Sequence, residues 1–321
     1  MTDAGATGAG VTVRTPAKVN LHLGVGHVRP DGFHPLDTVF HAISLYDDVT
    51  VSSGDPGSGP RVRVLGEAHV GLDEVPVDGD NLAHRAARLL GRSEGLAPDV
   101  LVEIHKSIPV AGGLAGGSAD AAATLVALDR LWGTEVADVD LYRLAAELGS
   151  DVSFALLGGS ARGTGRGEVL QRLTDHGSWW WVVVIAAEGL STPAVYRRFD
   201  ELFTTAPAKP SPGADVERAL ANGDPAALAR ALRNDLEPAA LDLRPELDGL
   251  IHRGEAAGAL RGLVSGSGPT CVFLCADAAT ARAVAGELQA TEGPRGAHVL
   301  VATGPAAGAH RVTYDRPVEA P

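Results

Sequence analysis

The chain has 321 residues, of which 45% are hydrophobic, so it is long enough for two domains that each bury a core. Its formal net charge of -13 argues against nucleic acid and anionic membranes as partners, because both attract a positive surface. No apolar run is long enough to span a membrane, and the N-terminus carries no signal-peptide pattern. We therefore expect a cytoplasmic protein, either a monomer or a homodimer.

The segment from Val11 to Val64 predicts several β-strands, which read "VTVRT", "KVNLHLGV", "TVFHAISL", "DVTVSS" and "RVRVL". In the second strand, alternation places three polar side chains on one face, namely Lys18, Asn20 and His22. A polar face is unusual for a strand whose neighbours are apolar. Only three of the 27 basic residues are lysines, which suggests that each retained lysine serves as a compact ammonium group.

A helix is predicted at "DNLAHRAARLLG", with Asp80 or Asn81 as its N-cap. The next strand, "DVLVEIHKSIP", is followed by a glycine-rich loop and by a helix from about Ser118, its expected N-cap, to Trp132. A third helix ends at Gly149, and Asp151 follows it in "GSDVSF".

The second half begins with the apolar strand "WWWVVVIAAEG". Helices are predicted near 216–221, 225–232 and 244–253, followed by the strand "TCVFLCA", a helix over about 279–289 and the strand "HVLVATG". The pattern predicts an α+β chain of two domains, 1–168 and 169–321. Cys271 and Cys275 read as buried apolar residues rather than a metal pair or disulfide, and Trp179 to Trp181 as a core strand rather than a sugar site. The histidines show no ligand spacing, so no metal ligands are predicted.

The glycine-rich stretch "IPVAGGLAGGSADAA" has the features of an anion site. Between a strand and a helix, exposed amides and the helix dipole favour negative charge, and glycines let phosphate oxygens approach. An ordinary strand-to-helix turn is the alternative. The P-loop motif is excluded because Ala119 and Asp120 stand where it requires lysine, and the Rossmann fingerprint also fails. "GTGRG" at 163–167 is not followed by a helix and is interpreted as a turn.

Three stretches together resemble the GHMP kinases, the superfamily of galactokinase, homoserine kinase and mevalonate kinase. They are "TPAKVNLHL", "PVAGGLAGGSADAA" and "VSGSGPTCVFL", in the family's order along the chain. The resemblance implies an N-terminal domain like domain 2 of ribosomal protein S5 and a ferredoxin-like C-terminal domain. It also implies ATP with Mg²⁺ as phosphoryl donor and an active site between the domains.

Within the superfamily, "RPDGFHPLDTVFHAISLYD", "DNLAHRAARLL", "GSDVSF" and "STPAVY" are most similar to the kinases that act on 4-diphosphocytidyl-2-C-methyl-D-erythritol. This resemblance implies that the 2-hydroxyl of that small molecule, an intermediate of the non-mevalonate isoprenoid route, is the acceptor. Two alternatives remain: a homoserine or mevalonate type of GHMP kinase, and a nucleotide-binding homologue without catalysis.

The resemblance also implies roles for individual residues. Asp151 is expected to act as catalytic base and Lys18 as its electrostatic partner. The expected ATP-binding residues are Asn81, Lys106, Pro109, Val110, Ala111, Gly112, Gly113, Leu114, Ala115, Gly116, Gly117 and Ser118. The expected substrate-binding residues are Asn20, Phe33, His34, Tyr196, Gly266, Ser267 and Gly268.

Two positions depart from the family pattern. Phe33 replaces the commoner tyrosine, yet with Tyr196 it still offers a flat face to a pyrimidine; simple core packing is the alternative for each aromatic ring. Asp120 puts a carboxylate in the first helical turn, where it would repel a phosphate. Bridging by Mg²⁺, or a side chain turned outward, would remove this conflict.

Overall fold

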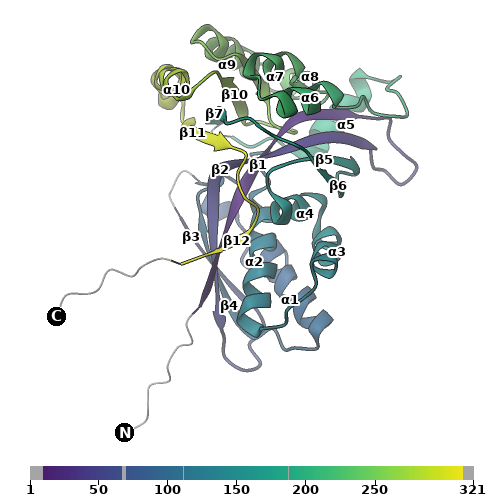
Figure 1. Ribbon diagram of the computed structural model, residues 1–321, viewed down its shortest axis with the longest axis vertical. Coiled ribbons are helices and arrows are strands. Elements are labelled where there is room, and N and C mark those ends of the chain that lie inside the picture. The colour runs from purple at the N-terminus through teal and green to yellow at the C-terminus, as the bar shows by residue number, and fades with distance from the viewer. Residues whose placement is uncertain (1–9, 67–69, 111, 187, 314–321) are drawn as a thin grey trace, which may run out of the picture.

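The computed structural model describes residues 10–66, 70–110, 112–186 and 188–313, and contains two β-sheets that share no strand. The lower half in Figure 1 is built on the larger sheet, with helices α1 to α4 on one side of it. The upper half is built on the smaller sheet and carries the helices α5 to α10. The α+β architecture predicted from the sequence is confirmed. Among the described residues, no helix is long and apolar enough to cross a membrane.

The first sheet has the strand order β12-β1-β2-β4-β3, with β5 and β6 attached through β2 and with β8 beside β1. Its strands are β1 (Val11–Val25), β2 (Leu36–Ser53), β3 (Arg61–Gly66), β4 (Val100–Lys106), β5 (Ser160–Gly165), β6 (Val169–Arg172), β8 (Arg233–Asn234) and β12 (His310–Val312). The helices beside it are α1 (Leu82–Glu94), α2 (Gly116–Trp132), α3 (Asp138–Leu148) and α4 (Ser150–Leu157), and a short 3₁₀ turn spans Leu72–Glu74. Because β12 pairs with β1, the end of the chain returns to the first sheet.

The second sheet is antiparallel, with the order β11-β7-β10-β9. Its strands are β7 (Trp179–Ile185), β9 (Arg261–Val264), β10 (Cys271–Cys275) and β11 (His298–Gly304). The helices of this half are α5 (Thr192–Leu202), α6 (Ala214–Asn222), α7 (Pro225–Ala231), α8 (Glu237–Leu243), α9 (Glu246–Ala256) and α10 (Ala278–Glu292), and a 3₁₀ turn spans Gly293–Arg295. Both cysteines are free and buried in β10, as predicted.

Strands β1 and β2 are longer than the sequence pattern predicts. Each was expected as two shorter strands, but β1 and β2 pair continuously from Val11 opposite Val51 to Val25 opposite Leu36. Pro16, which lies between the two expected strands, is at a register shift, where a bulge accommodates a residue without an amide hydrogen. The uninterrupted β1 therefore reaches from one half of the molecule into the other.

The hydrophobic core connects the two halves. Val19 and Leu21 of β1 belong to a core cluster that also contains Trp179 and Trp181 of β7 in the second sheet, whereas Leu23 and Val25 belong to a second core cluster, formed mainly by the second half. Trp179 and Trp181 are fully buried in the first of these cores, which confirms their predicted structural role. The domain boundary expected between 168 and 169 falls in the turn between the paired strands β5 and β6, and it stays a prediction.

Several helix boundaries were missed. Helix α2 starts at Gly116 rather than Ser118, and its N-cap is Ala115, whose side chain makes no capping hydrogen bond. Asp151, expected in a loop, lies in the first turn of α4. The helices α5 and α8 were not predicted, although each has a proline at its first or second position, where proline is compatible with a helix.

A buried hydrogen-bond chain joins β2 and β5 to the start of β7. His41 Nδ1 lies 2.8 Å from Ser160 Oγ, which donates to Asp175 Oδ2 at 2.6 Å. The other oxygen of Asp175 accepts from the indole of Trp179 at 2.8 Å. Burial lowers the pKa of His41 to about 4, although Asp175 opposes this effect. The imidazole is therefore neutral at pH 7.

We predict that this histidine makes folding sensitive to acid. Its pKa falls from 6.5 to about 4 on folding, so the unfolded chain binds more protons, and stability declines as the pH falls through that window. The contribution of His41 to the free energy of unfolding reaches about 3 kcal/mol. Urea titrations between pH 4 and 7 should show a shallower slope for His41→Gln. The exposed His252→Gln is the control, and equal slopes for His41→Gln and the wild type would contradict the prediction.

Candidate active site

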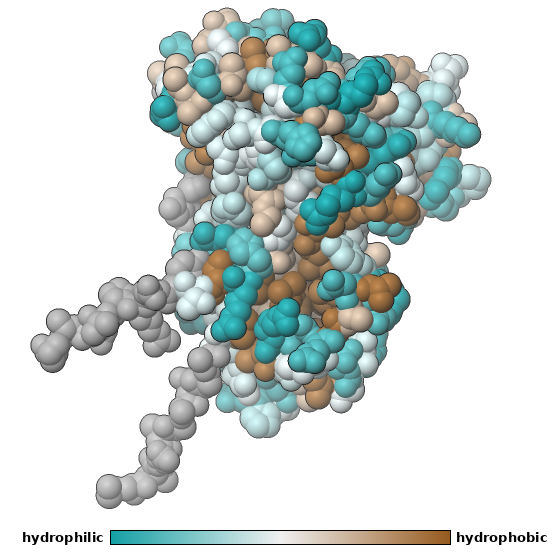
Figure 2. Space-filling model, in the orientation of Figure 1, coloured by the Kyte–Doolittle hydropathy of each residue, from teal (hydrophilic) through white to brown (hydrophobic). Residues whose placement is uncertain are grey.

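A cavity of about 620 Å³ lies between the two halves. Its walls come from β1, the glycine-rich loop, the starts of α1 and α4, the start of α5 and the loop after β9. Figure 2 shows apolar residues gathered in the hollow between the upper and lower halves, with polar residues around it. A partly apolar cleft of this size, with a few converging polar groups, is typical of a small-molecule site.

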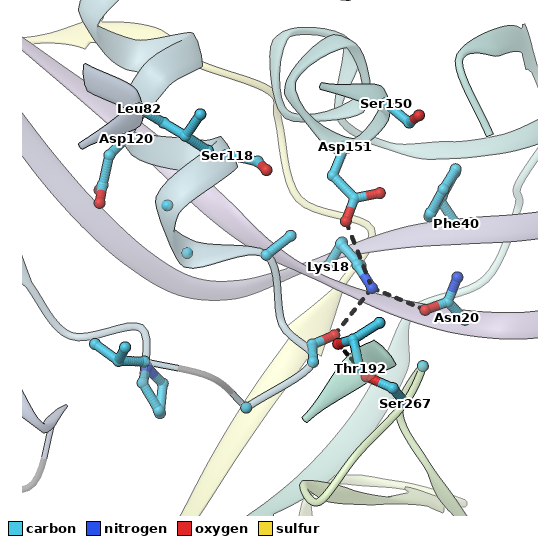
Figure 3. A pocket seen from close by; sticks show the side chains of 18 of the residues that line it. Lys18, Asn20, Phe40, Leu82, Ser118, Asp120, Ser150, Asp151, Thr192 and Ser267 are labelled. Carbon is cyan, nitrogen blue, oxygen red and sulfur yellow. Dashed lines mark hydrogen bonds and ion pairs between the residues drawn. The ribbon is translucent and has the colours of Figure 1, made fainter. Parts of the chain in front are cut away.

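Lys18 is the central polar group of this cavity. Its ammonium donates to Asn20 Oδ1 and to the carbonyl oxygen of Gly113, both at 2.9 Å. Asn20 is fixed in turn because its amide nitrogen donates to Thr38 Oγ1 at 2.8 Å. Lys18 and Asn20 of the predicted polar face therefore line the cavity, where Figure 3 shows them side by side. The third member, His22, does not line it, and its Nε2 lies 2.8 Å from the carbonyl oxygen of Ser211.

Asp151 approaches Lys18 from α4. Its Oδ2 lies 4.0 Å from Lys18 Nζ, and its side chain is 34% exposed while that of Lys18 is 9% exposed. Burial lowers the pKa of Lys18, and the nearby Asp151 carboxylate counteracts this shift. In Figure 3 the carboxylate points from the helix towards the ammonium. The structure thus brings together the two predicted catalytic residues, which are 133 positions apart in the sequence.

The glycine-rich loop has a tighter geometry than its sequence alone indicates. Gly113 has φ 74° and Ala115 has φ 61°, a conformation that is rare for a residue with a side chain. A Cβ on Gly113 would overlap the carbonyl oxygen of Ser265, and one on Gly112 would lie 2.9 Å from Thr270 Oγ1. These two glycines therefore allow the loop to pack against the loop after β9.

The glycines at the start of α2 have different surroundings. A Cβ on Gly116 would lie 3.0 Å from Lys106 Nζ, whereas one on Gly117 would meet only Leu82 Cδ1, at 3.8 Å. Gly117 is thus the glycine of this loop that leaves open space beside the helix N-terminus. Ser118 lines the same cavity.

The loop after β9 closes the cavity on the side of the second half. A Cβ on Gly266 would lie 3.3 Å from Asn20 Oδ1 and 3.5 Å from Lys18 Nζ, so this backbone lies directly against the polar face of β1. Asn234 donates to the carbonyl oxygens of Val264 and Gly266 at 2.9 and 2.7 Å and holds the loop in place. Ser267 Oγ lies 2.8 Å from Thr192 Oγ1.

Lys106 occupies a buried charge cluster rather than an open position. Its Nζ contacts Asp47 Oδ2 at 2.5 Å and Asp120 Oδ2 at 2.8 Å, and its side chain is 2% exposed. The second oxygen of Asp47 accepts from the amides of Ser107 and Ile108, directly before the glycine-rich loop. Burial alone would lower the pKa of Lys106, but Asp120 and Asp47 outweigh it and raise that pKa.

The sequence predicted that Asp120 would repel a bound phosphate unless Mg²⁺ bridged the two or the side chain turned outward. The buried cluster reduces this repulsion in a third way. The Asp120 carboxylate turns towards Lys106 and away from the Lys18–Asp151 pair, as Figure 3 shows, so part of its charge is compensated inside the protein. Burial raises the pKa of the Asp120 carboxyl, against the effect of Lys106. Asp120 Oδ1 is buried and has no hydrogen-bond partner.

A second cavity, of about 680 Å³, adjoins the first and contains the predicted aromatic residues. Phe33, His34 and Tyr196 line it together. The rings of His34 and Tyr196 are 4.9 Å apart, and His34 Nε2 lies 2.8 Å from Asp200 Oδ1. Burial, reinforced by Asp151, raises the pKa of Tyr196 to about 12, so its hydroxyl stays protonated.

Most of the predicted site residues line one of these two cavities. Leu114 does not, because it is buried in the core, although its carbonyl oxygen accepts from the amide of Lys18. Gly268 shapes the turn after β9 without lining either cavity, and Ala111 lies outside the described residues.

Sequence reasoning missed several residues that position the site. They are Thr38, Phe40, Asp47, Ser150, Thr192 and Asn234. All but Asn234 lie in the quoted motifs "RPDGFHPLDTVFHAISLYD", "GSDVSF" and "STPAVY", which were a usable signal, whereas nothing local distinguishes Asn234. Among the residues that the structure describes, no group of three or more His, Cys, Asp or Glu side chains is placed to hold a metal ion.

Comparison with known proteins agrees with this geometry. The family "GHMP kinases N terminal domain" matches residues 81–159, and "GHMP kinases C terminal" matches residues 216–293. The fold is therefore that of a GHMP kinase, a class of small-molecule kinases.

Individual relatives narrow the class. The 4-diphosphocytidyl-2-C-methyl-D-erythritol kinase of Nocardioides sp. strain JS614 is 59% identical over 302 residues, which cover 94% of this chain and 100% of that protein. A crystal structure of a 4-(cytidine 5'-diphospho)-2C-methyl-D-erythritol kinase is 34% identical, covers 91% of this chain and 98% of its own, and has a TM-score of 0.72. The chain belongs to the family of 4-diphosphocytidyl-2-C-methyl-D-erythritol kinases.

A more distant match shows the fold alone. The homoserine kinase of Cytophaga hutchinsonii has a TM-score of 0.74 at 18% identity, and the match covers 97% of this chain and 100% of that one. The same two-part fold is thus compatible with quite different sequences.

We predict that the ammonium of Lys106 is needed for stability, because it is the cation that compensates the buried carboxylates of Asp47 and Asp120. In Lys106→Met, two buried carboxylates lose their partner, which should lower the free energy of unfolding by about 3–5 kcal/mol. Asp120→Asn keeps the Lys106–Asp47 pair and removes a like-charge neighbour, so its effect should stay within about 1 kcal/mol.

Urea denaturation at pH 7 measures both effects, with the exposed Lys209→Met as the matched control. A Lys106→Met protein as stable as this control would contradict the prediction.

Proposed function

We propose that this protein transfers the γ-phosphoryl group of ATP to the 2-hydroxyl of 4-diphosphocytidyl-2-C-methyl-D-erythritol. The observation that carries the proposal is the Lys18–Asp151 pair beside the glycine-rich loop, in a cavity that adjoins the aromatic pocket around His34. The names of the relatives support the same substrate.

The first step is binding of the triphosphate by the loop from Pro109 to Ser118. Amides at the start of α2 lack intrahelical partners and can donate to phosphate oxygens, and the helix dipole adds a favourable field. Gly117 leaves the space that this approach requires. Asp47 pairs with Lys106 and accepts hydrogen bonds from two backbone amides directly before the loop. These contacts hold the start of the loop in place before ATP binds.

A magnesium ion bound to the nucleotide fits these surroundings. Mg²⁺ at kinase sites is held largely by phosphates and water, with only one or two protein oxygens. The Ser118 hydroxyl, which lines the cavity, would be a protein ligand for it, whereas the Asp120 carboxylate is buried against Lys106. When bound, the ion neutralises charge on the phosphates.

The protein then acts on the acceptor hydroxyl. Asp151 accepts its proton as the oxygen attacks the γ-phosphorus and ADP leaves. Lys18, fixed by Asn20 and by the Gly113 carbonyl, stabilises negative charge on the reacting oxygens. Because Lys18 is buried and held at three points, it needs little reorganisation during the reaction.

The aromatic pocket accounts for the cytidine. Asp200 accepts from His34 Nε2, so in the neutral ring Nδ1 is an acceptor, which suits the exocyclic amine of cytosine. Tyr196 and Phe33 line the same pocket and offer faces for the base. A substrate without a pyrimidine makes no use of these three side chains.

The proposal is tested by a coupled ADP-release assay with 4-diphosphocytidyl-2-C-methyl-D-erythritol, homoserine and mevalonate as acceptors. Turnover is expected only with the cytidyl compound. Equal or faster turnover of either other alcohol would overturn the assigned substrate, and no turnover of any would overturn the assignment as a kinase of these acceptors.

We predict that Asp151→Asn lowers kcat by about 10²–10⁴-fold, because the amide accepts no proton. Lys18→Arg should also lose activity, because the buried site fits an ammonium rather than a planar guanidinium. Both proteins should remain folded by circular dichroism. Asp140→Asn, on an exposed face of α3, is the control with unchanged activity, and a fully active Asp151→Asn enzyme would disprove the role of this residue.

We further predict an alkaline limit on activity set by Lys18. Its pKa lies below the usual 10.5, so the ammonium loses its proton, and kcat/KM falls, at a lower pH than for an exposed lysine. Asp151 raises this pKa, so in Asp151→Asn the alkaline limb of the residual activity should move to still lower pH. A pH–rate profile measures both, and an unmoved limb in Asp151→Asn would contradict the assignment.

A further inference from the structure

The two cavities share a junction, which we define by the residues that line both of them. These residues are Leu36, Ser150, Arg166, Thr192 and Tyr196. Arg166 is the charged member of this set. It lies in the "GTGRG" stretch, which the sequence pattern identifies only as a turn and which has no role in the mechanism above.

The turn that carries Arg166 is held in place by its neighbours. Gly165 and Gly167 flank it with φ 77° and 101°, and the amide of Arg166 donates to Glu168 Oε2 at 2.6 Å. A Cβ on Gly167 would lie 3.3 Å from the ring of Phe40, so this turn packs directly on the wall of the first cavity. The position of the Arg166 backbone at the junction is therefore well defined.

The side chain of Arg166 is placed over an aromatic ring. Its Cζ lies 4.7 Å from the centroid of Phe33, which lines the second cavity. Contact with the face of a ring leaves the N–H groups at the edge of the guanidinium available to donate to a ligand. Arg166 contributes to the lowered pKa of Asp31, but the ion pair of that carboxylate, at 2.7 Å, is with Arg29.

Arg166 is surrounded mainly by acidic side chains of the two cavities. Asp151, Glu147 and Asp200 line the two cavities, so an anionic ligand entering them meets carboxylates on several sides. Lys18 and Lys106 already donate to protein acceptors. Arg197 lines only the second cavity, which leaves Arg166 as the described cation at the point where the two cavities meet.

We propose that Arg166 determines specificity for an acceptor that carries a diphosphate, by donating hydrogen bonds to that diphosphate at the junction. The inference rests on the proposed function. A base in the second cavity and a hydroxyl beside Lys18 and Asp151 can be joined only across the junction, and the linking diphosphate is the anionic part of such a molecule. The planar fork of arginine matches phosphate oxygens in geometry as well as charge.

The test is a calorimetric titration of the full-length protein, saturated with an ATP analogue whose γ-phosphate cannot be transferred, with cytidine, CMP and CDP. The analogue keeps these ligands out of the ATP site. Arg166→Ala should weaken CDP binding by about 10–100-fold and leave cytidine binding unchanged, because only the charge-assisted contacts to phosphate are lost. Arg166→Lys should retain part of the CDP affinity.

Steady-state kinetics with the cytidyl diphosphate substrate complete the test. Arg166→Ala should raise the KM for this substrate, with the KM for ATP unchanged. Arg230→Ala, an exposed arginine of α7 remote from both cavities, controls for loss of one positive charge and should behave as the wild type. Because Arg166 is exposed on a turn, its variants should fold normally.

The possible failures are distinguishable. If the wild type neither binds CDP nor turns over the cytidyl substrate, the proposed function fails, and this inference with it. If the wild type does both and Arg166→Ala retains full CDP affinity, only the role of Arg166 is overturned. An equal loss of cytidine and CDP affinity, or a fall in kcat at unchanged KM, also overturns it, because a packing or phosphoryl-transfer role would then explain the residue.

Discussion

The buried ammonium of Lys18 is the constraint around which this site is arranged. A charge that is removed from water needs acceptors on several sides, and Lys18 obtains them from segments that are far apart in the sequence. Asn20 comes from its own strand, the Gly113 carbonyl from the glycine-rich loop and Asp151 from α4. The loop after β9 covers the remaining side at Gly266. Satisfying one lysine thus brings three segments of the first half together at the point where phosphoryl transfer is proposed.

The glycine-rich loop depends on contacts within the protein as much as on any ligand. Gly112 and Gly113 allow backbone to pack against the second glycine loop, and Gly116 allows Lys106 to approach the start of α2. Only Gly117 leaves open space. The density of glycine in this motif therefore reflects two glycine loops in contact and a buried lysine behind them. A rigid loop of this kind presents its amides to a phosphate at little entropic cost.

The two cavities separate chemistry from recognition. In the mechanism proposed above, Lys18, Asp151 and the helix N-terminus in the first cavity act in phosphoryl transfer itself. The rings in the second cavity, and Arg166 between the two, are proposed to bind the particular acceptor. Changes in the second cavity can alter the acceptor without disturbing the groups that transfer the phosphoryl group.

The sequence by itself determined the α+β class, the order of most elements and the three motifs. Local signals sufficed for these features, because alternation, caps and glycine clusters are properties of short segments. The site residues named from the sequence came from its resemblance to a known family, and most of them line the two cavities. Sequence reasoning failed where residues interact over long separations. It did not find the Asp47–Lys106–Asp120 cluster, the continuous β1 with its bulge at Pro16, or the meeting of Arg166 and Phe33 at the junction. Only the tertiary structure decided these, because burial and charge compensation depend on which distant segments pack together.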